Sequence, residues 1–483
     1  MQNDKKSNKP LRFAELSVTE ISKKGNGLAL LERPSSAPCW AEVPFTWPGD
    51  RVRVQLLSKQ RRVCQTILDQ VIQPAPERIP PLCSHFGSCG GCRFQHIPYS
   101  VQLAHKAALV EKMFADLATP ETKIFPIFGC ADPWHYRNKM EYSFTSDRAG
   151  NQYLGMMLQG RSRHAFNLME CPLTADWFVQ GVKSVREWWK TSELLAYHPA
   201  KNSGSLRTLT MREGRRTGDR LVMLTVSGNP EYALNKQQVE GFVATLRRAI
   251  EPPSPEQRLS IFLRIHQIHK GSPTQMYEMH LYGPEYFRET MHIKSSSEGA
   301  LQQLSFQVSP TAFFQPNTLQ AENLYSLALQ QTRLHKEMVV YDLYCGTGTL
   351  GICLAQEVKQ VIGIEISPEA VLDARTNIQL NQRENITLFA GAVHQVLNKQ
   401  QDLPKPDLVV VDPPRVGLDV ETIALLVKLR PRQILYISCN PESQALNAKE
   451  LLKQGYRLTS IQPIDQFPQT PHIENAIVME CLH

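Results

Sequence analysis

Two side chains near the carboxyl end of the chain could carry out covalent chemistry. Cys439 follows the apolar run Ile434 to Ile437, so it is expected where a strand ends, before a turn limited by Pro441. An isolated cysteine is more often a buried apolar residue, but this position favours a nucleophile. Glu474 lies 35 residues further along the chain and could return to the same sheet edge as a proton acceptor.

A second group of cysteines has the spacing of metal ligands. Cys83, Cys89 and Cys92 form a C-x5-C-x2-C pattern, and the glycines among them allow the chain to wrap tightly. We place the fourth ligand at Cys171, since a distant thiolate followed by proline is common in ferredoxin-type [4Fe-4S] clusters. The alternative is a zinc site completed by His85 or His96.

A glycine-rich turn and a distant carboxylate predict a nucleotide site. The run Asp342–Thr349 reads DLYCGTGT, and a Gly-x-Gly turn between strand and helix lets a nucleotide approach the backbone. Glu365 follows Gly346 by 19 positions, where a carboxylate accepts hydrogen bonds from ribose hydroxyls in both NAD and S-adenosylmethionine (SAM) domains.

Asp412 is expected at the same edge, at the end of a further strand. The two prolines that follow it stop the strand and stiffen the loop, so the carboxylate is held facing the cleft. An acid followed by Pro-Pro-aromatic would suggest methyl transfer to an exocyclic amine. Arg415 stands in place of the aromatic residue, which argues against that chemistry.

These residues require a sheet whose strands run parallel. From residue 305 onward, short apolar runs alternate with helical segments, at 339–343, 360–364, 386–389, 408–411 and 434–437. Nearly continuous apolar strands, each followed by a helix, indicate a parallel sheet covered on both faces. We therefore predict an α/β, doubly wound, Rossmann-like domain over residues 305–483.

Two further domains are expected before it. Residues 1–72 alternate short apolar runs with turn sequences, which indicates a small β-barrel of a kind that often binds oligonucleotides. Lys59, Arg61 and Arg62 suit that role, or form a solvated strand edge. Residues 73–304 mix strands and helices and are predicted to be an α+β domain.

Length and composition set the broad class. A chain of 483 residues is expected to form several domains, and 42% hydrophobic with 20% charged residues excludes wholesale disorder. The net charge of +7 fits a polyanionic partner but does not require one. We see no signal peptide and no apolar run long enough for a membrane span, so the eleven cysteines are expected in a reducing cytoplasm.

The ordered set of motifs resembles the RNA 5-methyluridine methyltransferases, and the resemblance covers nearly the whole chain. It comprises a barrel like a TRAM domain, the four cysteines, and the motifs YRNK, FFQPN, DLYCGTGT, GIE, DPPR, SCNP and PHIE in the family order. The resemblance implies that SAM contacts Gln315, Tyr344, Glu365 and Asp412. It further implies that Cys439 is the nucleophile and Glu474 the base. The cysteines match the [4Fe-4S] pattern of the ribosomal RNA branch, which favours 23S ribosomal RNA over transfer RNA as substrate, and the enzyme is expected to be a monomer.

Other residues follow less directly from the resemblance. Phe313 or Phe314 could stack on an extruded uracil, or either could be a core residue. Arg93, Arg137 and Lys139 are expected near bound RNA, or are ordinary surface charges. The run Ala390-Gly391-Ala392 departs from the polar or acidic residue that the family has near adenine, so the adenine contact there is expected from the backbone.

Two rival functions remain at this point. One is a non-catalytic Fe–S protein that binds RNA on a methyltransferase fold, and the other is an amino-methyltransferase that uses Asp412. Only a cysteine that attacks C6 of uracil would form a covalent adduct with RNA that contains 5-fluorouridine.

Overall fold

The computed structural model describes residues 12–32, 37–60, 63–161, 163–268, 271, 273–294 and 300–482. It divides into two compact units. Unit 1 contains the chain up to Ala104 together with Gln469–Pro471, and unit 2 contains His105–Pro468 and His472–His483. The division into domains 1–72, 73–304 and 305–483 stays a prediction. No helix in the described ranges is long and apolar enough to cross a membrane.

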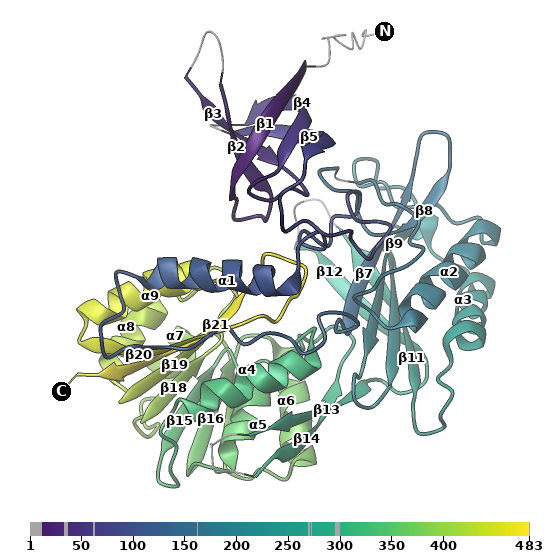
Figure 1. The fold of residues 1–483 in the computed structure, drawn as a ribbon. Coiled ribbons are helices and arrows are strands. Elements are labelled where there is room, and N and C mark those ends of the chain that lie inside the picture. Colours follow the sequence, from purple (N-terminus) through teal and green to yellow (C-terminus); the bar gives the residue numbers. More distant parts are fainter. Residues whose placement is uncertain are drawn as a thin grey trace. The chain divides into compact units, whose positions relative to one another are not determined.

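Unit 1 is built on a closed barrel of five strands in the order β1-β2-β3-β5-β4. The strands are β1 (Arg12–Ile21), β2 (Gly27–Leu31), β3 (Cys39–Val43), β4 (Arg51–Gln60) and β5 (Val63–Gln73). Alternate residues of these strands fill the interior, among them Val18, Ala41 and Val54. The predicted small β-barrel is confirmed (Figure 1). Arg61 and Arg62 lie outside the described residues, as does the side chain of Lys59.

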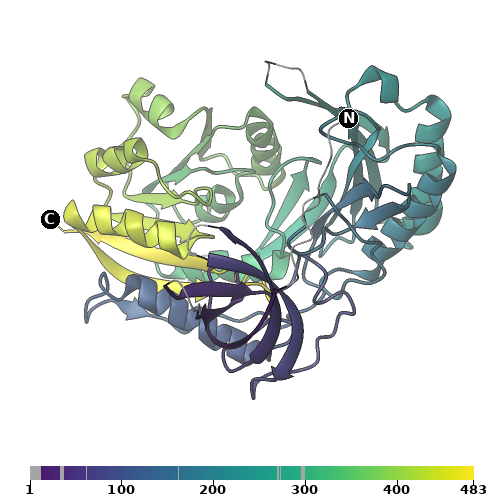
Figure 2. The same cartoon turned by 90° about the horizontal axis from the view of Figure 1, so that it is seen from above.

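The first part of unit 2 is a six-stranded sheet in the order β12-β11-β10-β9-β7-β8. Its strands are β7 (Lys139–Ser146), β8 (Gln152–Gly155), β9 (Leu206–Glu213), β10 (Arg220–Ser227), β11 (Leu259–Gln267) and β12 (Gln275–Tyr282). Two helices, α2 (Asp176–Thr191) and α3 (Lys236–Ile250), pack their apolar sides against one face of it. Both views place these helices on the side of the sheet away from β13 and β14 (Figures 1 and 2). A short 3-10 helix, Pro230–Tyr232, precedes α3.

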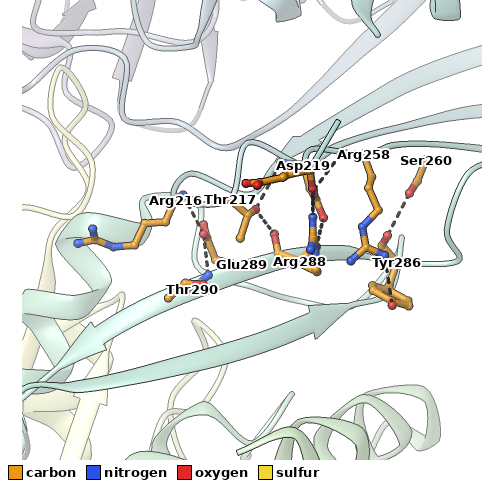
Figure 3. Close-up of polar contacts among 10 residues, drawn as sticks. Arg216, Thr217, Asp219, Arg258, Ser260, Tyr286, Arg288, Glu289 and Thr290 are labelled. Atoms are coloured by element: carbon orange, nitrogen blue, oxygen red, sulfur yellow. Dashed lines mark hydrogen bonds and ion pairs between the residues drawn. The ribbon is translucent and has the colours of Figure 1, made fainter. Parts of the chain in front are cut away.

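A hairpin of β13 (Phe287–Ile293) and β14 (Gln302–Val308) is attached to this sheet by buried polar contacts. The carboxylate of Asp219 accepts hydrogen bonds from the backbone and guanidinium of Arg288 and from the backbone N–H of Arg258 (Figure 3). Ser260 donates to the carbonyl of Tyr286 at 3.0 Å. These bonds satisfy charged and backbone groups that burial would otherwise leave unpaired, so they fix where the hairpin begins.

The second part of unit 2 is an eight-stranded sheet in the order β17-β16-β15-β18-β19-β21-β20-β6. Strands β15 to β19 run parallel, whereas β21 is antiparallel to both of its neighbours. The strands are β6 (Lys123–Ile124), β15 (Val339–Leu343), β16 (Gln360–Glu365), β17 (Ile386–Ala390), β18 (Leu408–Val411), β19 (Gln433–Ser438), β20 (Tyr456–Ile464) and β21 (Glu474–Cys481). The predicted doubly wound, Rossmann-like domain is confirmed.

Helices cover both faces of this sheet because successive strand residues point to opposite sides. A hydrophobic core therefore forms on each face of the sheet. Alternate residues of β15 belong to different cores: Val340 to the first and Tyr341 to the second. The first core includes α4 (Thr318–Gln330), α5 (Thr349–Ala355) and the end of α6 (Pro368–Leu380). The second includes α1 (Tyr99–Phe114), α7 (Val393–Lys399), α8 (Val420–Leu429) and α9 (Pro441–Lys453).

Candidate functional site

The glycine-rich turn after β15 brings backbone to the carboxyl edge of the sheet. Tyr344 adopts φ of 64°, a conformation that costs energy for a side chain with a Cβ. The N–H groups of Tyr344 and Cys345 both donate to the carbonyl of Ile364, at 2.9 and 3.2 Å. A Cβ placed on Gly346 would meet no atom within 4 Å, so open space adjoins the backbone at this turn. The turn can therefore accept a ligand against its main chain.

Glu365 is held beside this turn at the end of β16. One carboxylate oxygen accepts the N–H of Gly346 at 3.0 Å, and the other accepts the N–H of Ser367 at 2.8 Å. Each carboxylate oxygen keeps a further lone pair with which it can accept a hydrogen bond from a hydroxyl. The geometry fits the binding of ribose hydroxyls at this position.

The Ala390-Gly391-Ala392 run follows β17, next to Glu365. The N–H of Gly391 donates to the backbone carbonyl of Glu365 at 2.8 Å. Its φ of 145° is a conformation that suits glycine. The run offers small side chains and main chain to a base, and the backbone adenine contact stays a prediction.

Asp342, which is buried, lies near the end of β15, and Asp412, which is partly exposed, follows the neighbouring strand β18 at this edge. Burial raises the pKa of Asp342 to about 7, and the nearby carboxylates of Asp412 and Glu365 add to the effect. Burial also raises the pKa of Asp412 to about 7. Asp342 accepts the N–H of Gly351 in α5 at 2.8 Å, so it fixes the helix that follows the turn. Asp412, directly after β18, is left to act on a ligand.

Cys439 and Glu474 come from neighbouring strands. β19 and β21 pair with Ser438 opposite Asn475, which places the residue after one strand near the first residue of the other. Burial raises the pKa of Cys439 to about 11, and the carboxylates of Glu474 and Asp412 contribute. Glu474 is only 3% exposed, and burial together with Asp412 raises its pKa well above the usual range. The structure thus brings together the two residues that sequence reasoning assigned to covalent chemistry.

Arg415 is the cation beside this pair. Its guanidinium hydrogen-bonds to Cys439 and lowers the pKa of the thiol, and its charge also lowers the pKa of Glu474. A second contact joins its Nη2 to Nδ1 of His472 at 2.9 Å. Sequence reasoning treated Arg415 only as a missing aromatic residue. The signal that it missed is the arginine's position directly after Asp412-Pro-Pro, at the edge where Cys439 must lie.

Gln315 is buried, with 7% exposure, in the segment before α4. Its side-chain oxygen accepts from Gln466 at 3.4 Å, and its backbone carbonyl accepts from Asn138 at 3.0 Å. Gln315 also hydrogen-bonds to the hydroxyl of Tyr325, whose pKa burial raises, with Asp412 and Glu474 contributing. Gln315 therefore belongs to the same neighbourhood as Asp412 and Glu474.

Arg212 on β9 fixes the segment that leads to Gln315. Its side chain is buried, and Nη1 donates to the carbonyls of Ser309 at 3.1 Å, Pro310 at 3.1 Å and Ala312 at 2.7 Å. Asp373 on α6 accepts from the backbone N–H of Ser309 at 2.9 Å and from its hydroxyl. Sequence reasoning did not single out Arg212, although a charged residue inside an apolar strand was a visible signal.

The two phenylalanines of FFQPN differ in their exposure to solvent. Phe314 is 5% exposed and packs on Phe306 with ring centroids 5.6 Å apart, so it is a core residue. Phe313 is 63% exposed. Of the two, only Phe313 has a ring face available for a base.

The cysteines predicted to bind metal lie in both units: Cys83, Cys89 and Cys92 in unit 1 and Cys171 in unit 2. Cys83 and Cys92 are buried, while Cys89 and Cys171 are partly exposed. The N–H of Gly91 donates to the sulfur of Cys89 at 3.3 Å. Among the described residues, no group of three or more His, Cys, Asp or Glu side chains is placed so that it could hold a metal ion. The [4Fe-4S] cluster and the zinc alternative therefore stay predictions.

The three basic residues predicted near RNA differ in burial. Lys139 begins β7, and burial lowers its pKa to about 8, with the charges of Arg212, Arg137 and Arg264 contributing. Arg137 donates to the carbonyl of Lys139 at 3.1 Å. In unit 1, burial lowers the pKa of Arg93, whose guanidinium lies over the ring of Phe45 at 5.8 Å.

Comparisons with known proteins agree with this geometry. The sequence model of a family described as tRNA (Uracil-5-)-methyltransferase matches residues 274–481. A protein of Protochlamydia amoebophila described as an uncharacterized RNA methyltransferase is 52% identical over 91% of this chain and 99% of its own length. Another of that description, from Chlorobaculum tepidum, is 32% identical over 90% of this chain and 89% of its own length.

A solved structure shares the fold over nearly the whole chain. It is the crystal structure of Pyrococcus abyssi tRNA (uracil-54, C5)-methyltransferase in complex with S-adenosyl-L-homocysteine. The TM-score is 0.70 at 23% sequence identity, and the match covers 96% of this chain and all of that one.

Proposed function

Because this chain belongs to the RNA uracil-5 methyltransferase family, we propose that it transfers a methyl group from SAM to C5 of one uridine in RNA through a covalent adduct of Cys439. The observation that carries the proposal is the pairing of Cys439 with Glu474 at adjoining strand ends. The glycine turn, Glu365 and Asp412 lie at the same edge of the sheet. A nucleophile, a base and a nucleotide edge are together the parts that this reaction needs.

Cofactor binding is assigned to four residues that fit the group. Glu365 would accept the ribose hydroxyls, while the main chain at Tyr344 and the open space at Gly346 receive the rest of the nucleoside. Asp412 and Gln315 lie toward Cys439 and Glu474, so they would hold the amino-acid part. When bound, SAM supplies an electrophilic methyl group.

The chain's own residues then perform addition and elimination. The thiolate of Cys439 adds to C6 of uracil, the electron pair moves into an enolate, and C5 takes the methyl group. Glu474 removes the proton from C5, after which the bond between sulfur and C6 breaks and the thiolate leaves. The raised pKa of Glu474 suits a proton acceptor, and Arg415 stabilises the thiolate that both steps require.

Base extrusion is assigned to Phe313. Both faces of the uracil ring must be reached, since sulfur adds at C6 while methyl arrives at C5, so the base has to leave its stack. An exposed ring on the segment that also carries Gln315 suits stacking against it.

The substrate class is proposed as 23S ribosomal RNA, in the cytoplasm, with the enzyme acting as a monomer. The support for ribosomal RNA is the sequence pattern of Cys83, Cys89, Cys92 and Cys171, which resembles the [4Fe-4S] branch of the family. A transfer RNA substrate is the second candidate, favoured by the description of the matching family. Iron analysis and the absorption spectrum of anaerobically purified protein test the cluster. Stoichiometric zinc without iron would overturn it.

The covalent step is tested by trapping. Incubation with SAM and RNA that contains 5-fluorouridine should yield a protein–RNA adduct that is stable to denaturation, because no C5 proton can be removed. Cys439→Ala should abolish the adduct and the 5-methyluridine, whereas Cys481→Ala, at the other end of β21, should leave both unchanged. Methylation that persists in Cys439→Ala would favour an amino-methyltransferase. The absence of methylation by the unaltered protein on any cellular RNA would favour a non-catalytic RNA-binding protein.

A further inference from the structure

One face of the six-stranded sheet is covered by α2 and α3, and the other carries a row of polar residues. Across the strands, Ser143 pairs with Thr208, Thr208 with Thr225, and Thr225 with Arg264. Paired residues on neighbouring strands lie on the same face. The apolar residues between them, such as Tyr142 and Leu224, pack with the helices. The row therefore lies on the face opposite α2 and α3.

Three cationic side chains and one histidine gather around this row and are called here the sheet-face patch: Lys139, Arg207, Arg264 and His266. The charge of Arg264 acts on Lys139 and on His266. That of Arg207 acts on His266 as well, while its guanidinium stacks on Tyr197 at 4.0 Å. The register shift between Thr225 and Val226 interrupts the pairing of β9 and β10 beside Arg207.

Carboxylates compensate the sheet-face patch only in part. Glu278 pairs with Arg264 at 2.9 Å, and Glu141 acts on Lys139. Nη1 of Arg207 is shielded from solvent and has no hydrogen-bond acceptor among the described residues. Like charges held this close repel one another, and an unsatisfied guanidinium costs free energy. An external anion would remove both costs.

We propose that the sheet-face patch binds the sugar–phosphate backbone of the substrate RNA, away from the reacting uridine. The patch extends across the sheet from Lys139 on β7 to Arg264 on β11, three strand spacings or about 14 Å, which is wider than one phosphate group. The hydroxyls of Ser143 and Thr208 can donate further bonds to phosphate oxygens. A polymer of phosphates fits this spread better than a small anion. The inference rests on the proposed function for the identity of the polymer.

The test measures RNA affinity as a function of salt with the full chain. The probe is oligouridylate, since backbone contacts do not depend on sequence. Each lost phosphate contact reduces the slope of log K against log salt by about 0.7 for single strands, so Arg207→Gln with Arg264→Gln should reduce it by about 1.4. At about 0.1 M salt this corresponds to roughly 25-fold weaker binding.

Arg247→Gln is the matched control. Arg247 lies on α3, stacks on Tyr282 at 4.4 Å and pairs with Glu251, so it has the same kinds of contact as the two test residues. Its variant should keep the slope of the unaltered protein. Should the double variant lose its fold, Arg207→Gln alone should reduce the slope by about 0.7.

The outcomes separate this inference from the proposed function. If Arg207→Gln and Arg264→Gln leave the slope unchanged while uridine methylation continues, the inference is wrong and the function stands. If the slope falls but the unaltered protein makes no 5-methyluridine, the RNA-binding surface stands and the function is wrong. Equal loss in the Arg247→Gln control would show that net charge, rather than this surface, governs binding, and would also overturn the inference.

Discussion

The loss of Arg415 tests the assignment of the nucleophile directly. Its guanidinium lowers the pKa of Cys439, in opposition to burial and to the carboxylates of Glu474 and Asp412. A hydrogen bond to a charged group contributes about 1.5–3 kcal/mol, and we take the lower end because Arg415 is exposed and solvent screens its charge. Since one pKa unit corresponds to about 1.4 kcal/mol, Arg415→Met should raise the pKa of Cys439 by about one unit.

The assay is alkylation of Cys439 by iodoacetamide over a range of pH, followed by mass spectrometry. Alkylation tracks the thiolate, so the higher pKa in Arg415→Met should slow it about tenfold at any pH below that pKa. Arg415→Lys keeps the charge and should lie between the two. Cys481 in the same sample reports on reagent and fold. An alkylation profile that does not move in Arg415→Met would refute the role given to this arginine.

Three further outcomes are expected. Lys106→Met should lower the free energy of unfolding by about 3–5 kcal/mol in urea denaturation, because it leaves Asp465 buried without the partner that lies 2.6 Å away. Combining it with Asp465→Leu should recover most of this loss, and a double variant that recovers nothing would contradict the reasoning. Arg212→Met removes a donor shared by three carbonyls, so it should weaken SAM binding, measured by calorimetry, about tenfold while the affinity for oligouridylate stays unchanged. An unaltered SAM affinity would refute the role of Arg212 in positioning the segment that leads to Gln315. The pKa of Asp412 is raised to about 7, so this carboxyl group is protonated below that pH, and SAM affinity should increase as the pH rises through about 7. Asp412→Asn should abolish this pH dependence. A dependence that persists in the variant would belong to another group.

The sheet that carries the site was predictable because local pattern and global fold agree there. Apolar strands such as Val339–Leu343, each followed by a helix, leave little choice but a covered parallel sheet. The barrel was predictable for a similar reason, since short alternating strands between turns favour closure. In both cases the pattern of apolar residues within each strand indicates whether the strand is buried on one face or on both.

The supporting residues could not be predicted in the same way. Arg212 acts on carbonyls about a hundred positions later in the chain, and Lys106 pairs with an aspartate more than three hundred positions away. Such contacts depend on how elements pack, which the spacing of residue types does not encode. The contact of Arg415 with Cys439 was missed for that reason too. The metal site predicted from the spacing of Cys83, Cys89 and Cys92 is not seen among the described residues and stays a prediction.

Gln469–Pro471 has a consequence for biosynthesis. These three residues belong to unit 1, where the carbonyl of Gln469 accepts from Arg93 and Phe94, and its side chain bonds with that of Gln102. A nascent chain that has left the ribosome as far as Ala104 therefore lacks a piece of its first unit. That piece arrives only after more than three hundred further residues have been translated. Completion of unit 1 therefore depends on the synthesis of residues that lie far beyond Ala104 in the chain.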